Sequence, residues 1–210
     1  MNGVWKCVLT LSCVLALSVP ASATVLTFED LDPGYAAYGF VPAGYAGFAW
    51  GGDYGAYWIT EDYHPVSGYH NVATMAPNSR MAIFTPGQSA MSMSDDAFTL
   101  NSLDIGAAWN DDQYVTVAGY LNGSLVDSDY FVAPVTGMTK SFDWGWVDTA
   151  WITPDLDTGV PHPGFEYGGA GCHFVAVDNI DYTAAPGLPA FVLVGAAPVV
   201  GGLVRRLRRK

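Results

Sequence analysis

Apolar and polar residues alternate over short runs between Thr24 and Thr183, and no stretch keeps the 3.6-residue spacing of a long amphipathic helix. Gly, Pro, Asn and Asp separate the runs, as they do where strands end in turns. The pattern predicts strands at 25–29, 71–75, 81–85, 98–109, 114–121, 124–132, 138–144, 147–152 and 173–182. Short strands at such regular intervals are typical of a sandwich or barrel, so we predict an all-β fold.

Two local signals refine this prediction. In the run 98–109 the apolar residues Phe98, Leu100, Leu103 and Ile105 are the candidates to face the core. Asn122-Gly123 stands between two strand patterns, and this dipeptide favours a two-residue hairpin because both residues tolerate positive φ. We therefore expect the strands on either side of it to pair directly.

The N-terminus has the pattern of a secretory signal. Lys6 precedes an apolar run over 7–19, Pro20 interrupts the run, and Ala21-Ser22-Ala23 matches an A-x-A cleavage site. The pattern predicts that residues 1–23 are removed, so that the mature chain begins at Thr24 and is exported.

A second apolar segment lies at the C-terminus. Residues 188–204 carry no charge, and Arg205, Arg206, Arg208, Arg209 and Lys210 follow. At 1.5 Å per residue such a helix is about 25 Å long, close to the thickness of a bilayer core. Basic residues favour the cytoplasmic side, so we expect a helix in the inner membrane with the preceding domain outside the cytoplasm.

The charge distribution excludes one class of partner. Between Glu29 and Asp181 lie all 20 acidic residues but only two basic ones, Arg80 and Lys140, which gives a net charge of −18. A domain this acidic repels phosphate backbones, so we expect no nucleic-acid partner. Once residues 1–23 are removed, Cys172 is the only cysteine left, and the mature chain cannot form an internal disulfide.

The C-terminal segment from Ala185 to Lys210 resembles the PEP-CTERM sorting signal, in which a linker, a short apolar helix and an arginine cluster end the chain. The family's Pro-Glu-Pro is here Pro186-Gly187-Leu188-Pro189, without the glutamate. The resemblance implies processing by an exosortase-type membrane protease, with display at the cell surface or release. A plain tail anchor is the alternative.

The preceding domain is similar to the ectodomains that accompany such tails. The similarity lies in four stretches, at 47–50, 67–69, 107–120 and 169–180, and extends over most of 25–183. Those ectodomains resemble carbohydrate-binding jelly rolls. The resemblance therefore implies a jelly-roll-like antiparallel β-sandwich over 24–184, in a protein of the exopolysaccharide-rich extracellular matrix.

A calcium site is one candidate feature of the domain. Glu29 ends the first predicted strand and Asp30 follows it, and Asp178 lies in the last. In a jelly roll the first and last strands are usually neighbours, and calcium takes carboxylate and carbonyl oxygens. We predict that Glu29, Asp30 and Asp178 bind a structural calcium ion; the alternative is that they are solvated turn residues.

A glycan platform is the second candidate. Tyrosine and tryptophan are dense between residues 35 and 69, and flat aromatic rings stack on the apolar C–H faces of sugars. The candidates are Trp50, Tyr54, Tyr57 and Trp58. The alternative is that these rings pack in the core, as aromatic residues commonly do in β-proteins.

Catalytic motifs are missing from the sequence: it contains no Gly-x-Ser-x-Gly, no His-Glu-x-x-His and no phosphate-binding loop. We therefore expect a non-catalytic envelope protein, with glycan binding as its candidate activity. Two alternatives stay open: a glycoside-active enzyme that uses an Asp/Glu pair, and a purely structural protein without a ligand.

Overall fold

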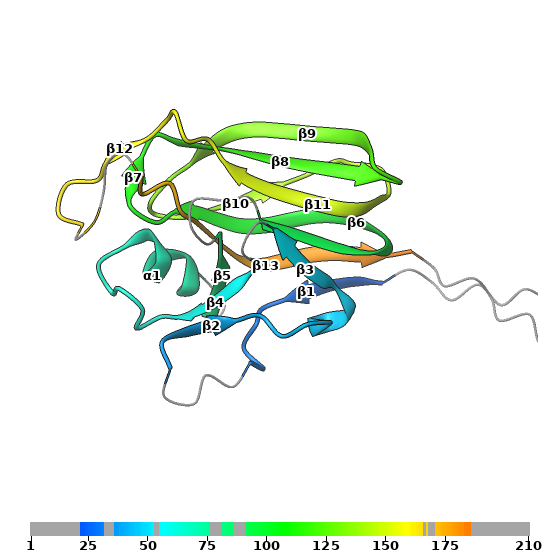
Figure 1. Ribbon diagram of the computed structural model, residues 1–210, viewed down its shortest axis with the longest axis horizontal. Coiled ribbons are helices and arrows are strands. Elements are labelled where there is room, and N and C mark those ends of the chain that lie inside the picture. The colour runs from blue at the N-terminus through cyan, green and yellow to red at the C-terminus, as the bar shows by residue number, and fades with distance from the viewer. Residues whose placement is uncertain are drawn as a thin grey trace, which may run out of the picture. The chain divides into compact units, whose positions relative to one another are not determined.

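The computed structural model describes residues 22–31, 36–52, 55–75, 81–85, 91–165, 167 and 171–185. These residues form antiparallel strands with one short α-helix, α1 (Gly68–Ala73), and one 3-10 turn, η1 (Tyr45–Gly47) (Figure 1). The strands are β1 (Ala23–Leu26), β2 (Tyr38–Phe40), β3 (Ala49–Gly52), β4 (Tyr57–Thr60), β5 (Met81–Phe84), β6 (Met91–Ala107), β7 (Asn110–Asp111), β8 (Gln113–Leu121), β9 (Ser124–Ala133), β10 (Met138–Ser141), β11 (Val147–Pro154), β12 (Val160–Pro161) and β13 (Val175–Ala184).

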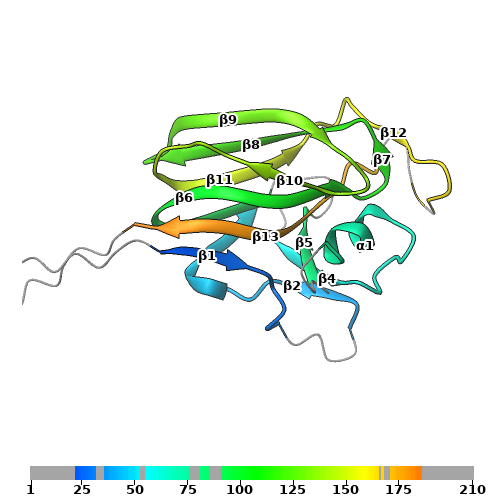
Figure 2. The same ribbon diagram turned by 180° about the vertical axis from the view of Figure 1, so that it is seen from behind.

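The long strand β6 links the two layers of the sandwich. Its first half pairs with β11 and β3, and its second half pairs with β10 and β13. From β6 the strand order runs through β11 and β8 to β9 in one direction, and through β13, β5 and β4 to β2 in the other. Figure 2 shows β10, β6, β13 and β1 side by side on the opposite face of the molecule.

The core lies between these layers. Phe98, Leu100, Leu103 and Ile105 of β6 are all buried in it, as predicted for these apolar residues. Val115 and Val117 of β8, with further apolar side chains of β11 and β13, complete the same cluster. The predicted antiparallel all-β sandwich is thereby confirmed.

The predicted hairpin is also confirmed. Leu121 pairs with Ser124, so Asn122 and Gly123 form a two-residue connection between β8 and β9. Both residues have positive φ, 51° and 75°, as a type I′ turn requires. The backbone N–H of Asn122 also donates a hydrogen bond to Asp148 Oδ2 at 2.5 Å, which ties the turn to β11.

The prediction of a strand at 71–75 is wrong, because this segment belongs mostly to α1. Ser67 caps the helix: its hydroxyl accepts a hydrogen bond from the backbone N–H of His70. Tyr69, Val72 and Ala73 follow at the three- and four-residue spacing of a buried helical face. The helix is only six residues long, too short for this spacing to stand out among the strand patterns.

Other boundaries differ from the predicted ones. β6 begins at Met91, seven residues before the predicted run, and β1 spans Ala23–Leu26 rather than 25–29. The sequence analysis missed β2, β3, β4, β7 and β12, each four residues or shorter. Such short runs leave too few positions for an alternating pattern to be recognised.

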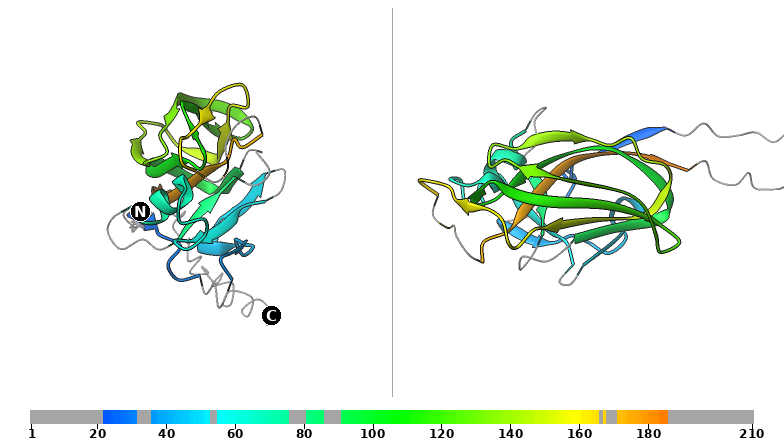
Figure 3. Two further views of the ribbon diagram at one scale, coloured as in Figure 1. Left: turned by 90° about the vertical axis from the view of Figure 1, so that its left-hand side faces the viewer. Right: turned by 90° about the horizontal axis from the view of Figure 1, so that it is seen from above.

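The described domain begins and ends at one edge of the sandwich. β1, drawn in blue, and β13, drawn in orange, run to the same end of the domain (Figure 3, right). They pair along the whole length of β1, with Ala23 opposite Thr183. The predicted signal peptide up to Ala21, and the sorting residues Pro186, Gly187, Leu188, Pro189, Arg205, Arg206, Arg208 and Arg209, lie outside the described residues. Within the described ranges, no helix has the length and hydropathy needed to cross a membrane.

Candidate functional site

One surface of the sandwich combines aromatic rings with hydroxyl groups. On β8, Val115 and Val117 point into the core, so Tyr114, Thr116 and Tyr120 lie on the opposite face of the strand. The neighbouring strands repeat this arrangement, because register fixes which side chains share a face. We call the set the aromatic–hydroxyl face; its members are Ser92, Ser94, Tyr114, Thr116, Ala118, Tyr120, Ser128, Tyr130, Thr149, Trp151 and Thr153.

Trp151 lies in the middle of this face. In the strand register it is opposite Ala118 on one side and Ser92 on the other, and both side chains are small. The indole is partly exposed, although the next residues on either side, Ala150 and Ile152, are buried in the core. A flat ring between small neighbours leaves its surface open to a planar or chair-shaped ligand.

Tyr114 and Tyr130 form a stacked pair at one end of the face. Their ring centroids are 4.9 Å apart, and the ring planes differ by 23°. Tyr130 is 56% exposed. Its hydroxyl donates a hydrogen bond of 2.5 Å to Asp155 Oδ2, so its side chain reaches from β9 across β8 to the residue that follows β11.

The Tyr130–Asp155 bond changes the pKa of both groups. Mainly through this hydrogen bond, the pKa of the Tyr130 phenol is raised to about 12. The same bond, with a second one from the backbone N–H of Asp157, lowers the pKa of the Asp155 carboxyl. At neutral pH the site therefore presents a protonated phenol next to an ionised carboxylate.

A buried amide holds the Asp155 backbone in place. Gln113 has no exposed surface, and its Nε2 donates hydrogen bonds to the carbonyl oxygens of Asp155 at 2.7 Å and Tyr114 at 3.0 Å. Its Oε1 lies 2.9 Å from His173 Nδ1, and Thr158 Oγ1 accepts a bond from the backbone N–H of Tyr114. The backbone of Asp155 is thus tied to the backbone of Tyr114.

The predicted glycan platform does not form a common surface. Trp58 is 9% exposed and packs in the core; its ring lies over Gly39, where a Cβ would be 2.6 Å from Trp58 Cζ2. Trp50 pairs with Met93 on the inner side of its sheet, and its Nε1 donates to the carbonyl oxygen of Tyr45. Trp58 is thus too buried to stack on a sugar, so its assignment as a platform residue is wrong, whereas that of the partly exposed Trp50 stays a prediction.

The other two platform candidates have different positions. Tyr57 is partly exposed and packs against Phe40, with ring centroids 4.2 Å apart. It also contacts Phe84, so one side of its ring is used in packing. Tyr54 lies outside the described residues.

The three predicted calcium ligands are placed around one tyrosine. The Tyr45 hydroxyl donates to Asp30 Oδ1. The pKa of Tyr45 is raised by burial, by this hydrogen bond, and by the negative charges of Asp30, Asp178 and Glu29. Asp178 is fully buried on β13. The charges of all three acids thus act on the Tyr45 hydroxyl, and their binding of calcium stays a prediction.

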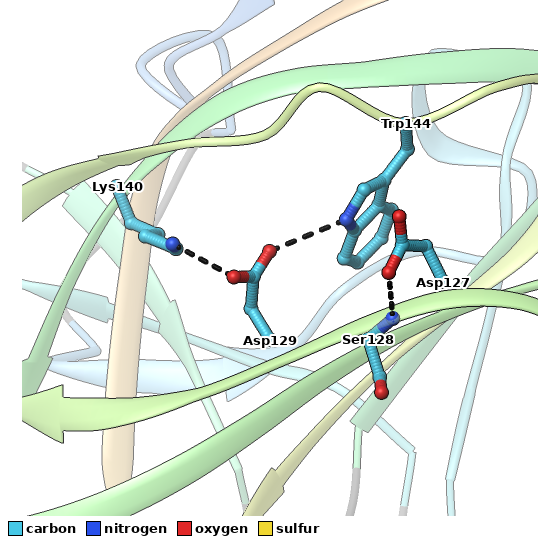
Figure 4. A network of polar contacts seen from close by, with 5 residues as sticks. All are labelled: Asp127, Ser128, Asp129, Lys140 and Trp144. Atoms are coloured by element: carbon cyan, nitrogen blue, oxygen red, sulfur yellow. Dashed lines mark hydrogen bonds and ion pairs between the residues drawn. The ribbon is translucent and has the colours of Figure 1, made fainter.

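The described residues contain no group of three or more His, Cys, Asp or Glu side chains arranged to hold a metal ion. The one described lysine has a structural role instead. Lys140 Nζ lies 3.0 Å from Asp129 Oδ1, and Trp144 Nε1 donates to Asp129 Oδ2 at 3.2 Å. Figure 4 shows Asp129 between these two partners, with Asp127 bound to the backbone N–H of Ser128 nearby.

The aromatic–hydroxyl face was missed by the sequence analysis, which searched for dense aromatic residues. A usable signal was present in residues 114–120, where Tyr, Thr, Ala and Tyr alternate with apolar or small core residues. Trp151 alternates in the same way with Ala150 and Ile152. Aromatic and hydroxyl side chains at every second position mark the outer face of a strand.

Among known proteins, the chain is similar only to solved structures. No protein-family model matches the chain, and no curated protein matches it significantly. A family 32 carbohydrate-binding module of AlyQ, in complex with 4,5-unsaturated mannuronic acid, is 11% identical with a TM-score of 0.33, covering 65% of this chain and 95% of that one.

Two further solved structures have similarly low sequence identities and TM-scores. A DUF4465 family protein from Bacteroides ovatus is 10% identical with a TM-score of 0.36, covering 80% of this chain and 97% of that one. A family 51 module from Clostridium perfringens GH95, in complex with methyl-galactose, is 10% identical with a TM-score of 0.32, covering 77% and 99%. At this level the similarities do not identify a function for this chain.

Proposed function

We propose that the protein is an exported, non-catalytic β-sandwich that binds a glycan through the aromatic–hydroxyl face. The observation that carries the proposal is the position of Trp151, a partly exposed indole between Ala118 and Ser92 in the middle of this face. The surrounding serine and threonine hydroxyls can donate and accept hydrogen bonds, as sugar hydroxyls require. An extended chain of sugars could lie along the row from Trp151 to the Tyr114–Tyr130 pair.

Export and anchoring complete the proposal. The signal pattern of residues 1–23, the apolar segment 188–204 and the basic residues after it support a domain held outside the cytoplasm. A glycan-binding domain in that place would attach the protein to extracellular polysaccharide. An exosortase-type enzyme is the proposed processing partner, because of the resemblance of the segment 185–210.

The test compares two substitutions of exposed aromatic residues. Trp151→Ala removes the central ring of the face, and Phe40→Ala removes a ring that is 65% exposed on β2, at the opposite end of the strand order from β9. On a glycan array, we expect Trp151→Ala to lower affinity for any bound glycan roughly 30-fold, as central aromatic contacts commonly do. Phe40→Ala should bind like the wild type.

Other outcomes would support the alternatives. Turnover of a polysaccharide, abolished by Asp155→Asn, would indicate a glycoside-active enzyme. Absence of binding across the array would contradict the proposal and favour a purely structural role. Binding that is lost with Phe40→Ala but kept with Trp151→Ala would place the site on a different surface.

A further inference from the structure

The charged side chains at the aromatic–hydroxyl face are acidic. Lys140 is the only lysine or arginine among the described residues, and its ammonium group is engaged by Asp129. Asp129 pairs with Val117, so it projects to the core side of β9 rather than to the aromatic–hydroxyl face. No lysine or arginine of the described ranges therefore belongs to this face, whereas Asp155 and the exposed Asp157 stand at one end of it.

The Asp155 carboxylate is fixed in position but has capacity for a ligand. Its Oδ2 accepts from Tyr130 and its Oδ1 accepts from the backbone N–H of Asp157 at 3.0 Å. An ionised carboxylate offers about four acceptor positions, so about two are left for a bound molecule. Because these two bonds hold its oxygens, the carboxylate needs little reorganisation when a ligand binds.

The aromatic rings, like the carboxylate, favour a positively charged ligand. The faces of tyrosine and tryptophan rings carry partial negative charge and attract cations. Tyr130 bonds to Asp155 and stacks with Tyr114, and Trp151 lies farther along the same face, on the strand that leads to Asp155. An ammonium group on a sugar could thus bond to the carboxylate while its ring carbons pack on an aromatic side chain.

We infer, on the basis of the glycan-binding function proposed above, that the aromatic–hydroxyl face binds a polysaccharide of amino sugars with free ammonium groups. Asp155 is the residue that selects the ammonium group over the acetylated amine. Uronic-acid and sulfated glycans are disfavoured, because they bring negative charge to a face without lysine or arginine, on a segment of net charge −18.

The experiment measures calorimetric affinities of the full-length protein for three hexasaccharides: glucosamine, N-acetylglucosamine and mannuronate. The buffer is mildly acidic, so that the glucosamine amines carry protons, and low in salt. We expect the glucosamine hexamer to bind at least roughly tenfold more tightly than the acetylated one, as for a hydrogen bond to a charged group. The mannuronate hexamer should bind most weakly.

Three variants separate local recognition from bulk charge. Asp155→Asn removes the charge and keeps a hydrogen-bond acceptor, so the preference for glucosamine should fall roughly tenfold. Asp127→Asn is the matched control: it removes one exposed carboxylate of β9 that pairs with Gly119 and lies on the other side of the strand. It should leave the preference unchanged. Trp151→Ala should weaken both neutral and charged hexamers.

The outcomes distinguish failure of the inference from failure of the proposed function. Equal or tighter binding of the acetylated or mannuronate hexamer, lost with Trp151→Ala, would overturn the amino-sugar inference and keep the glycan-binding function. Absence of binding to all three would count against both. A lysine hexamer that binds as tightly as the glucosamine hexamer would show that bulk charge accounts for the preference, and would overturn the inference.

Discussion

Aromatic residues are used differently in two regions of this domain. In the described part of the segment 35–69, the rings mostly pack on other rings: Tyr69 contacts Phe84 and Trp109, and Tyr63 contacts Tyr38. On the aromatic–hydroxyl face, Trp151 has Ala118 and Ser92 as its cross-strand neighbours. A dense cluster of aromatic residues in the sequence thus indicates packing here, whereas isolated rings among hydroxyls remain accessible.

The first prediction contrasts one tryptophan from each region. Trp58→Ala should lower the free energy of unfolding by about 3–5 kcal/mol, because it removes a large buried side chain and leaves a cavity over Gly39. Trp151→Ala should lower it by less than about 1 kcal/mol, since the indole lies on the surface. Urea denaturation of both variants measures the difference; similar losses would show that the two rings are equally part of the core.

The second prediction concerns Glu29, Asp30 and Asp178, whose charges act on Tyr45 of the packed region. If Glu29, Asp30 and Asp178 bind calcium, a hundredfold excess of calcium over Kd adds about 2.7 kcal/mol to stability. For a domain of this size this raises the melting temperature by about 5–11 °C. The measurement is a melting curve of chelator-treated protein with and without calcium.

Two controls define that experiment. Asp178→Ala should remove the calcium-dependent shift, and magnesium should substitute poorly because it requires a near-ideal octahedron of ligands. If millimolar calcium leaves the melting curve of the wild type unchanged, the three acids are structural residues of the Tyr45 cluster and not metal ligands.

The third prediction tests how far α1 supports the packed region. Ser67→Ala removes the N-cap of the helix and the bond from its hydroxyl to the carbonyl oxygen of His64 at 2.6 Å. A loss of about 1 kcal/mol in unfolding free energy is expected for such a cap. Glycan binding should not change, since Ser67 is not part of the aromatic–hydroxyl face. Ser67→Thr, which keeps a hydroxyl, should recover part of the lost stability.

The fourth and smallest effect is in the titration of Asp155. Tyr130→Phe removes the hydrogen bond that is the main cause of the lowered pKa of this carboxyl, so the pKa should rise toward its ordinary value of 3.8. A carboxyl whose pKa is lowered in the folded state stabilises the fold at pH values above its unfolded-state pKa. This contribution is lost as the pH falls through the folded-state pKa. NMR titration of the carboxyl carbons measures the change, and Tyr114→Phe is the matched control.

Strand patterns allowed much of the fold to be predicted from the sequence. The apolar residues Phe98, Leu100 and Ile105 were correctly predicted as buried positions of β6, and Asn122-Gly123 identified the β8–β9 turn. Helix α1 could not be recognised by periodicity, because six residues contain less than two helical turns. The cap at Ser67 was the only local signal for it.

The candidate site was harder to predict, because it depends on strand register. Trp50, Trp58 and Trp151 are all single tryptophans in strands. Trp50 and Trp58 face the core, whereas Trp151 does not. The difference comes from which neighbours pair with each strand, and sequence spacing alone does not determine that pairing. The Tyr130–Asp155 bond joins residues 25 positions apart and follows only from the order β9–β8–β11.

The pairing of β1 with β13 also determines how the domain responds to mechanical force. Ala23 and Thr183 are opposite each other at the same edge, so tension applied at the first and last strands pulls their adjacent ends apart. In that geometry the hydrogen bonds between the two strands break one after another rather than together. Single-molecule stretching by these two ends should therefore peel β1 away at low force, before the strands around β6 separate.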